Sequence, residues 1–210
     1  MSFTHEELAV MDSIIARYPK KRSAVMPLLH YVQSLDGYVT ERGIETIAEK
    51  LDLSTAEVTA VSSFYTQYKS EPVGEYHVGI CTNTLCAIMG GDAIYESVCQ
   101  NIGIKKDQTT ADGKISLERI ECNAACDYAP VVMVNWEFYD NQTPASVNEL
   151  LDGVRSGNPP APTRGPSKLR TWKENSAVLA GLSDGLAEEG LQAGEASLLG
   201  LNIAKSQGSK

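Results

Sequence analysis

The sequence YHVGICTNTLC occupies residues 76–86 and contains the features that decide the fold. Its first part, from Tyr76 to Ile80, is short and mostly apolar, and turn-forming residues precede it, so it predicts a buried strand. Cys81 follows that strand directly, and Cys86 lies a few positions further along the chain. This arrangement places two thiols in the segment that leaves a core strand.

A second pair of cysteines follows another predicted strand. Residues 114–120 alternate between apolar and polar side chains, which is typical of a strand, and Cys122 and Cys126 come just after it. In a compact α/β domain, loops at the same edge of a sheet are neighbours, so the four thiols can converge on one point. The remaining cysteine, Cys99, lies within a predicted helix and is interpreted as a small buried apolar side chain.

The spacing of these cysteines fits more than one kind of site. Grouped cysteines in a reducing compartment indicate metal ligands or redox groups. Zinc takes tetrahedral ligands, commonly in pairs with about two to four intervening residues, whereas a Cys-x4-Cys loop opens the plant-type [2Fe–2S] ferredoxin pattern. The Cys-x-x-Cys spacing of a redox disulfide is absent, and the histidines lie outside the cysteine loops, which disfavours a Rieske centre. By spacing alone, a [2Fe–2S] cluster is favoured over zinc and over inert buried thiols.

Two segments, CTNTLC at residues 81–86 and CNAACDYAP at residues 122–130, resemble those of a known family. This family is the small thioredoxin-like [2Fe–2S] subunits of respiratory complex I, the E subunits of bacterial NADH:quinone oxidoreductases. The resemblance covers roughly residues 1–155 and includes the 35 residues between the two pairs. It implies four cluster ligands, one pair on each iron: Cys81 with Cys86, and Cys122 with Cys126.

The same resemblance implies an electron-transfer subunit that exchanges an electron with FMN, where FMN and NADH are bound by a partner subunit. It implies an enzyme only as part of this proton-translocating complex, and the chain itself carries no nucleotide-binding fingerprint. A diaphorase subunit of an NAD-linked hydrogenase or formate dehydrogenase is the alternative, because the cysteine segments do not separate the two. A free-standing ferredoxin-like carrier and a zinc-binding interaction module are further alternatives. Three positions depart from the family pattern: Leu85 replaces a frequent Pro, Ala124 replaces a frequent Gly, and Trp136 replaces a frequent small polar or acidic residue.

Residues 1–70 are predicted to form a bundle of four amphipathic helices. Apolar side chains recur there at helical spacing. Ser or Thr followed three residues later by Glu marks two helix starts as capping boxes, at Thr4 with Glu7 and at Ser54 with Glu57. The bundle is interpreted as a scaffold, since periodic apolar stripes usually form a core.

Residues 71–157 alternate predicted strands and helices, which indicates an α/β fold. A helix is expected from about Cys86 to Ile102, with Gly90-Gly91 interpreted as a site of close packing between helix and sheet. A last helix begins at Thr143-Pro144, an N-cap followed by Pro at the first helical position. The predicted fold class is therefore α/β: an N-terminal helical bundle, a thioredoxin-like [2Fe–2S] ferredoxin domain and an extended tail.

Residues 158–210 are predicted to be a tail that binds partner subunits. A Pro-rich linker opens it at 158–166, and glycines recur after it, so a separate core is not expected. The tail nevertheless contains more apolar side chains than a solvated tail requires. The basic stretch at 168–173 also contains Trp172, a residue type favoured at interfaces. We therefore expect an extended segment that Trp172 anchors on other subunits of the peripheral arm.

Composition and charge exclude several classes of function. The 210 residues are 42% hydrophobic and 21% charged, as in ordinary soluble globular proteins. A net charge of −9 leaves no basic face for phosphates, so nucleic-acid binding is not expected. No apolar run approaches the roughly 20 residues of a membrane span, and the first residues lack a signal-peptide pattern. We therefore expect no direct membrane insertion. The resemblance implies a position in the peripheral arm on the cytoplasmic side of the plasma membrane.

Overall fold

The structure, a computed structural model, describes residues 2–105, 107–186, 189–190 and 194–208. The chain divides into a helical unit and an α/β unit, and each unit draws on two separate stretches of sequence. The helical unit comprises Met1–Glu75 and Arg170–Asp184, and the α/β unit comprises Tyr76–Leu169 and Gly185–Lys210. The chain therefore returns to the helical unit after it has built the sheet.

The N-terminal part of the helical unit contains the four helices that the amphipathic patterns predict. They are α1 (His5–Ile15), α2 (Val25–Asp36), α3 (Glu41–Leu51) and α4 (Thr55–Phe64), with a 3-10 turn at Lys21–Ala24 before α2. Both predicted capping boxes are formed. The apolar faces of the helices meet in one core that includes the fully buried Met11, Ile14 and Leu28.

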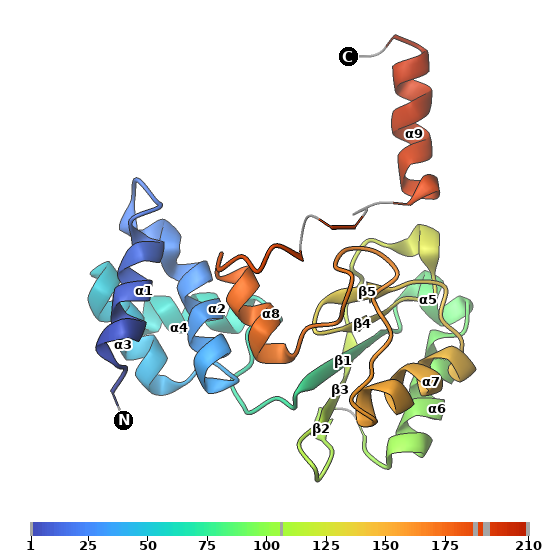
Figure 1. The fold of residues 1–210 in the computed structure, drawn as a ribbon, viewed down its shortest axis with the longest axis horizontal. Helices are drawn as coiled ribbons and strands as arrows, with labels where there is room; N and C mark the ends of the chain where they lie inside the picture. The colour runs from blue at the N-terminus through green and yellow to red at the C-terminus, as the bar shows by residue number, and fades with distance from the viewer. Residues whose placement is uncertain (1, 106, 187–188, 191–193, 209–210) are drawn as a thin grey trace. The chain divides into compact units, whose positions relative to one another are not determined.

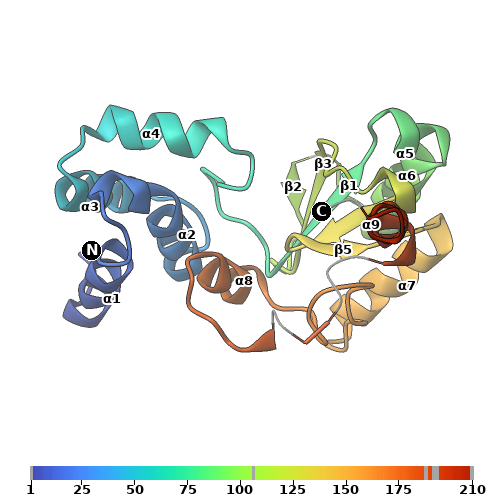
Figure 2. The ribbon, with the colours of Figure 1, turned by 90° about the horizontal axis from the view of Figure 1, so that it is seen from above.

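The predicted partner-binding tail instead supplies a further helix of this unit. Helix α8 (Trp172–Leu179) packs along α2, as Figures 1 and 2 both show. Trp172 is only 2% exposed, and its indole N–H donates to the carbonyl oxygen of Gly37 at 2.7 Å. The expectation that Trp172 anchors the chain on another subunit is therefore wrong, because its side chain is buried within this chain.

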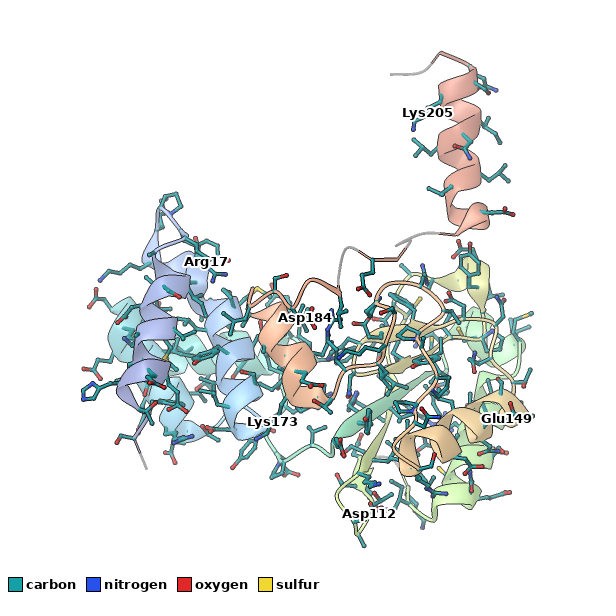
Figure 3. The ribbon with its side chains drawn as sticks, in the orientation of Figure 1. Arg17, Asp112, Glu149, Lys173, Asp184 and Lys205 are labelled. Atoms are coloured by element: carbon teal, nitrogen blue, oxygen red, sulfur yellow. The ribbon has the colours of Figure 1, made fainter. Side chains whose placement is uncertain are left out.

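Polar contacts fix α8 and its flanks in place. The Lys173 ammonium donates to the carbonyl oxygen of Leu35 at 2.7 Å, so Trp172 and Lys173 together satisfy carbonyls at the C-terminal end of α2. Arg170 and Asp184 form a bidentate ion pair, at 2.7 and 2.9 Å, across the ends of the returning segment. Figure 3 labels Lys173 and Asp184 at these two places. The segment is thus held by its own side chains at several points along its length.

A buried histidine makes the stability of the helical unit depend on pH. Burial lowers the pKa of His30 from 6.5 to about 4, and its ring lies 4.8 Å from that of Tyr68. Below pH 6.5 the unfolded chain binds a proton that the folded chain does not, so the free energy of unfolding falls as the pH drops toward 4. The full loss is about 3 kcal/mol. Denaturant titrations across this pH range measure it.

Two variants test this expectation. His30→Phe removes the titrating group but keeps a flat ring beside Tyr68, so its free energy of unfolding is expected to change less between pH 6.5 and 4. His5→Gln is the control for the loss of a histidine at an exposed position. If the free energy of unfolding changes equally with pH in the wild-type chain and in His30→Phe, the assignment of this pH dependence to His30 is contradicted.

The α/β unit is built on a five-stranded sheet with the order β2-β3-β1-β4-β5. The strands are β1 (Tyr76–Cys81), β2 (Gln108–Thr109), β3 (Ile115–Ile120), β4 (Val132–Val134) and β5 (Glu137–Tyr139). Strands β1 and β3 are parallel, and the other pairs are antiparallel. Helices α6 (Gly91–Ile102) and α7 (Pro144–Arg155) lie together and pack with the sheet in one apolar core (Figure 1). The predicted α/β fold class is confirmed.

The single helix expected from Cys86 to Ile102 is two helices in the structure. Helix α5 (Thr84–Ile88) ends before Gly90, and α6 begins after it. Gly90 has φ 113°, a conformation that residues with a Cβ atom rarely adopt, so the glycine allows the chain to turn between the helices. Strand β2 is not predicted either, because two exposed residues carry no periodic pattern.

The expected Pro-rich linker runs along the edge of the sheet. The N–H of Thr163 donates to the carbonyl oxygen of Phe138 at 2.9 Å, and the Tyr139 hydroxyl donates to that of Pro160 at 2.8 Å. Helix α9 (Glu195–Ser206) lies further on. The expectation of an extended tail is therefore wrong where α8 and α9 form, while its residues 187–188, 191–193 and 209–210 lie outside the described residues.

Candidate metal centre

Two parallel strands bring the four predicted ligands to one edge of the sheet. The register of β1 and β3 pairs Cys81 with Ile120, so the segment that continues to Cys122 leaves the sheet beside Cys81. Cys86 lies on α5, which follows β1, and Cys126 begins a short 3-10 helix after β3. Parallel strands end at the same edge of a sheet, and this is the reason that cysteines distant in sequence become neighbours.

The four thiols form two pairs that lie close to each other. The Sγ atoms of Cys122 and Cys126 are 3.4 Å apart. The neighbouring Cys81 and Cys126 thiols both help to raise the pKa of Cys86, and Cys122 and Cys81 both help to raise that of Cys126, so the two pairs are neighbours. Among the residues that the structure describes, no three His, Cys, Asp or Glu side chains gather as ligands of one ion. The arrangement in pairs suits a [2Fe–2S] cluster, which takes two ligands on each iron.

The two pairs differ in their exposure. Cys81 and Cys86 are each 3% exposed and belong to an apolar group that includes Val131, whereas Cys122 is exposed and Cys126 is half-buried. Burial, reinforced by the neighbouring Cys81 thiol, raises the pKa of Cys86 to about 11. A metal is bound by the thiolate, so its binding must displace a proton from this thiol.

Close backbone packing supports the first cysteine loop. A Cβ atom at Gly91 would lie 2.5 Å from the carbonyl oxygen of Cys81 and 2.9 Å from that of Cys86. Glycine therefore lets α6 begin this close to both cysteines, which refines the close packing expected at Gly90-Gly91. The N–H of Cys81 donates to the carbonyl oxygen of Val131 at 3.2 Å, and the Val131 backbone offsets part of the rise in the pKa of Cys86. Sequence reasoning misses Val131, since an apolar strand residue gives no sign of such contacts.

Hydrogen-bond donors reach a sulfur atom in each loop. The N–H of Ala124 lies 3.4 Å from Cys122 Sγ, and Ala124 has φ 57°. This left-handed geometry favours glycine and costs an alanine about 1 kcal/mol, which accounts for the frequent Gly of the family pattern. The Nδ2 atom of Asn83 lies 3.9 Å from Cys81 Sγ and 3.1 Å from the carbonyl oxygen of Ile120. Four thiols with N–H donors at the sulfurs fit a [2Fe–2S] cluster.

Two further residues whose side chains can bind metals lie elsewhere in the α/β unit. Cys99 is half-buried on α6 and packs against the core of the sheet, in keeping with its interpretation as an apolar side chain. His77 is buried on β1 and contacts the Glu118 carboxylate, with 2.6 Å between Nε2 and Oε2. Cys99 and His77 therefore lie outside the candidate metal site.

Comparison with known families decides between the metals. The sequence profile of the thioredoxin-like [2Fe–2S] ferredoxins matches residues 11–155. The chain belongs to this family. Membership of the thioredoxin-like [2Fe–2S] ferredoxins confirms the resemblance seen in the two cysteine segments, and it confirms one [2Fe–2S] cluster as the cofactor in place of zinc.

Two curated relatives are similar to this chain over a longer stretch than the ferredoxin domain covers. The E subunit of the NADH-quinone oxidoreductase of Mycobacterium tuberculosis is 55% identical over 193 residues, which are 91% of this chain and 76% of the relative. The corresponding subunit of Thermus thermophilus, named NADH-quinone oxidoreductase subunit 2, is 34% identical over 160 residues, 75% of this chain and 88% of the relative. The Mycobacterium match is long enough to include part of the segment that forms α8 and α9.

A solved structure shares the fold at lower identity. The NAD+-reducing [NiFe]-hydrogenase in its air-oxidized state gives a TM-score of 0.56 with 20% identity, over 63% of this chain and 23% of the hydrogenase chain. At this identity the similarity shows the fold alone. It therefore does not favour the hydrogenase alternative over the quinone-reducing complex.

Proposed function

We propose that the chain is the electron-transfer subunit of an NADH:quinone oxidoreductase. The observation that carries the proposal is the pairing of four thiols at the shared end of β1 and β3. Relatives at 55% and 34% identity that bear this name support the choice of complex. The proposed ligands of its [2Fe–2S] cluster are Cys81 and Cys86 on one iron, and Cys122 and Cys126 on the other.

The chain's own groups hold the site and set its surroundings. A bound [2Fe–2S] cluster supplies one-electron oxidation and reduction. Cys81 and Cys86 hold their side of the site away from water, since both are almost fully buried. The exposed Cys122 leaves the opposite side open, where a redox partner can approach. N–H donors at the sulfurs tune the reduction potential, which depends on hydrogen bonding and solvent exposure.

An apolar surface beside the site supports a protein partner. Leu85 and Ile88 on α5, and Met89 at its C-cap, are 42%, 76% and 56% exposed and lie close in sequence to the buried Cys86. Their spacing places them on one face of the helix. Apolar patches of this kind mark protein–protein contacts, and the partner proposed here is the subunit that binds FMN and NADH. Exposed apolar side chains on α9 support contact with further peripheral-arm subunits: Leu199, Leu201 and Ile203.

The proposed place of the chain is the peripheral arm on the cytoplasmic side of the membrane. In the described parts of the chain, every helix is too short or too polar to cross a bilayer. Attachment to the membrane-bound complex is then provided by partner subunits, in agreement with the apolar surfaces on α5 and α9.

Reconstitution tests the proposed function. The full chain, loaded with iron and sulfide, is mixed with the FMN-bearing subunit and NADH, and the reduced cluster is followed by electron paramagnetic resonance (EPR). We expect a [2Fe–2S] signal on addition of NADH only when both proteins are present, since this chain lacks a nucleotide-binding fingerprint. NADH oxidation by this chain free of FMN and partner contradicts the proposal. Co-purification with hydrogenase subunits in place of quinone-reductase subunits supports the alternative complex.

A further inference from the structure

We propose that Asn83 is a positioning residue that sets the reduction potential of the cluster through Cys81. The inference rests on the proposed function, because it requires Cys81 to be a cluster ligand. Its basis is a single amide nitrogen, Asn83 Nδ2, that lies 3.9 Å from Cys81 Sγ and 3.1 Å from the carbonyl oxygen of Ile120. One side chain therefore contacts both a ligand sulfur and the strand that leads to the second cysteine pair.

Asn83 stands at a position where its side chain would ordinarily cap a helix. Helix α5 begins at Thr84, and Asn83 has the extended backbone of an N-cap residue, with φ −79° and ψ 165°. Asn is among the most favoured N-cap residues, because its side-chain oxygen accepts a hydrogen bond from the first helical turn. In α5 the Asn83 side chain makes no such bond. Its amide group contacts the cysteine site in place of the helix.

The chemistry of the two neighbours fixes the orientation of the amide. A carbonyl oxygen and a ligand sulfur are both hydrogen-bond acceptors, so the NH2 group of Asn83 must face them and the side-chain oxygen must point away. The two contacts also join the cysteine loops. Ile120 is paired with Cys81 in the register of β1 and β3, and it lies just before Cys122 in the chain. The Asn83 amide thus holds Cys81 in a defined place relative to the second loop.

A hydrogen-bond donor at a ligand sulfur favours the reduced state of the cluster. An added electron makes the cluster and its ligand sulfurs more negative, and an N–H group directed at a sulfur stabilises that charge. Ala124 offers Cys122 a comparable donor, but that donor is a backbone group that side-chain substitution does not remove. Asn83 donates through its side chain. Its replacement therefore changes the hydrogen bonding of a ligand sulfur without removing a ligand.

The test is an EPR-monitored redox titration of the full chain loaded with iron and sulfide. Asn83→Ala is expected to make the midpoint potential more negative, with an about tenfold fall in the equilibrium constant for reduction, or about 59 mV for one electron. Asn83→Asp keeps the shape but replaces the donor by a carboxylate, so its shift is expected in the same direction and at least as large. The matched control is Asn123→Ala, because Asn123 donates to the carbonyl oxygen of Glu121 at 3.2 Å; its potential is expected to stay unchanged.

Equal midpoint potentials for Asn83→Ala and Asn123→Ala overturn the inference. If both Asn83 variants lose the cluster, pulsed EPR of the Asn123→Ala chain with isotope-labelled asparagine decides the matter. A weak coupling between the reduced cluster and an asparagine side-chain nitrogen is then expected, and its absence overturns the inference. A wild-type chain that shows no [2Fe–2S] signal overturns the proposed function as well, so the two failures are distinguishable.

Discussion

Replacement of Cys81, Cys86, Cys122 or Cys126 by serine is expected to abolish or severely alter the [2Fe–2S] EPR signal of the chain. Each thiol is one of two that the proposed site offers to an iron, and the thiolate is the form of cysteine that binds metal. A serine hydroxyl gives up its proton far less readily than a thiol. The bound iron and sulfide, measured chemically, and the EPR spectrum of the reduced protein check each variant.

Cys99→Ser is the matched control for the four ligand variants. It makes the same chemical change, but Cys99 lies on α6 and packs against the core of the sheet, apart from the group of four thiols. We expect its iron content and EPR signal to equal those of the wild-type chain. A lost cluster in Cys99→Ser, together with an intact one in Cys122→Ser, overturns the ligand assignment.

The four proposed ligands could be singled out from the sequence because the signals that mark them are local. Each pair of cysteines follows a strand pattern, and the end of a strand can be recognised without knowing its neighbours. The supporting contacts could not be predicted in the same way. Asn83 contacts Ile120, and Cys81 contacts Val131. The two residues of each contact are far apart in the sequence, and only the pairing of β1 with β3 and β4 brings them together.

The helical unit shows the same division between local and distant signals. The capping box of Thr4 with Glu7 spans one helical turn, and sequence predicts it correctly. Trp172 is different, because its hydrogen-bond partner Gly37 lies 135 positions away in the chain. A tryptophan among basic residues has the same local pattern whether it binds another subunit or the first helices of its own chain. The return of the chain to the helical unit therefore has no sequence signature.

Removal of the Trp172 side chain is expected to destabilise the helical unit strongly. Trp172→Ala deletes a fully buried indole at the contact of α8 with α2 and leaves the carbonyl oxygen of Gly37 without its 2.7 Å donor. Truncation of a buried aromatic side chain to alanine costs about 3–5 kcal/mol. For a unit of this size, each kcal/mol lowers the melting temperature by about 4–8 °C. Thermal unfolding followed by far-ultraviolet circular dichroism measures the loss of helix.

Controls separate this structural role from partner binding. Leu179→Ala alters an apolar residue of the same helix that is 42% exposed, so a much smaller loss of stability is expected. Truncation after Asp184 keeps the returning segment, whereas truncation after Gly157 removes α8. Only the second is expected to lower the melting temperature of the helical unit as Trp172→Ala does, because only the second uncovers α2. A Trp172→Ala chain that melts like the wild-type protein yet no longer co-purifies with partner subunits would mean that Trp172 is an interface residue, contrary to its burial here.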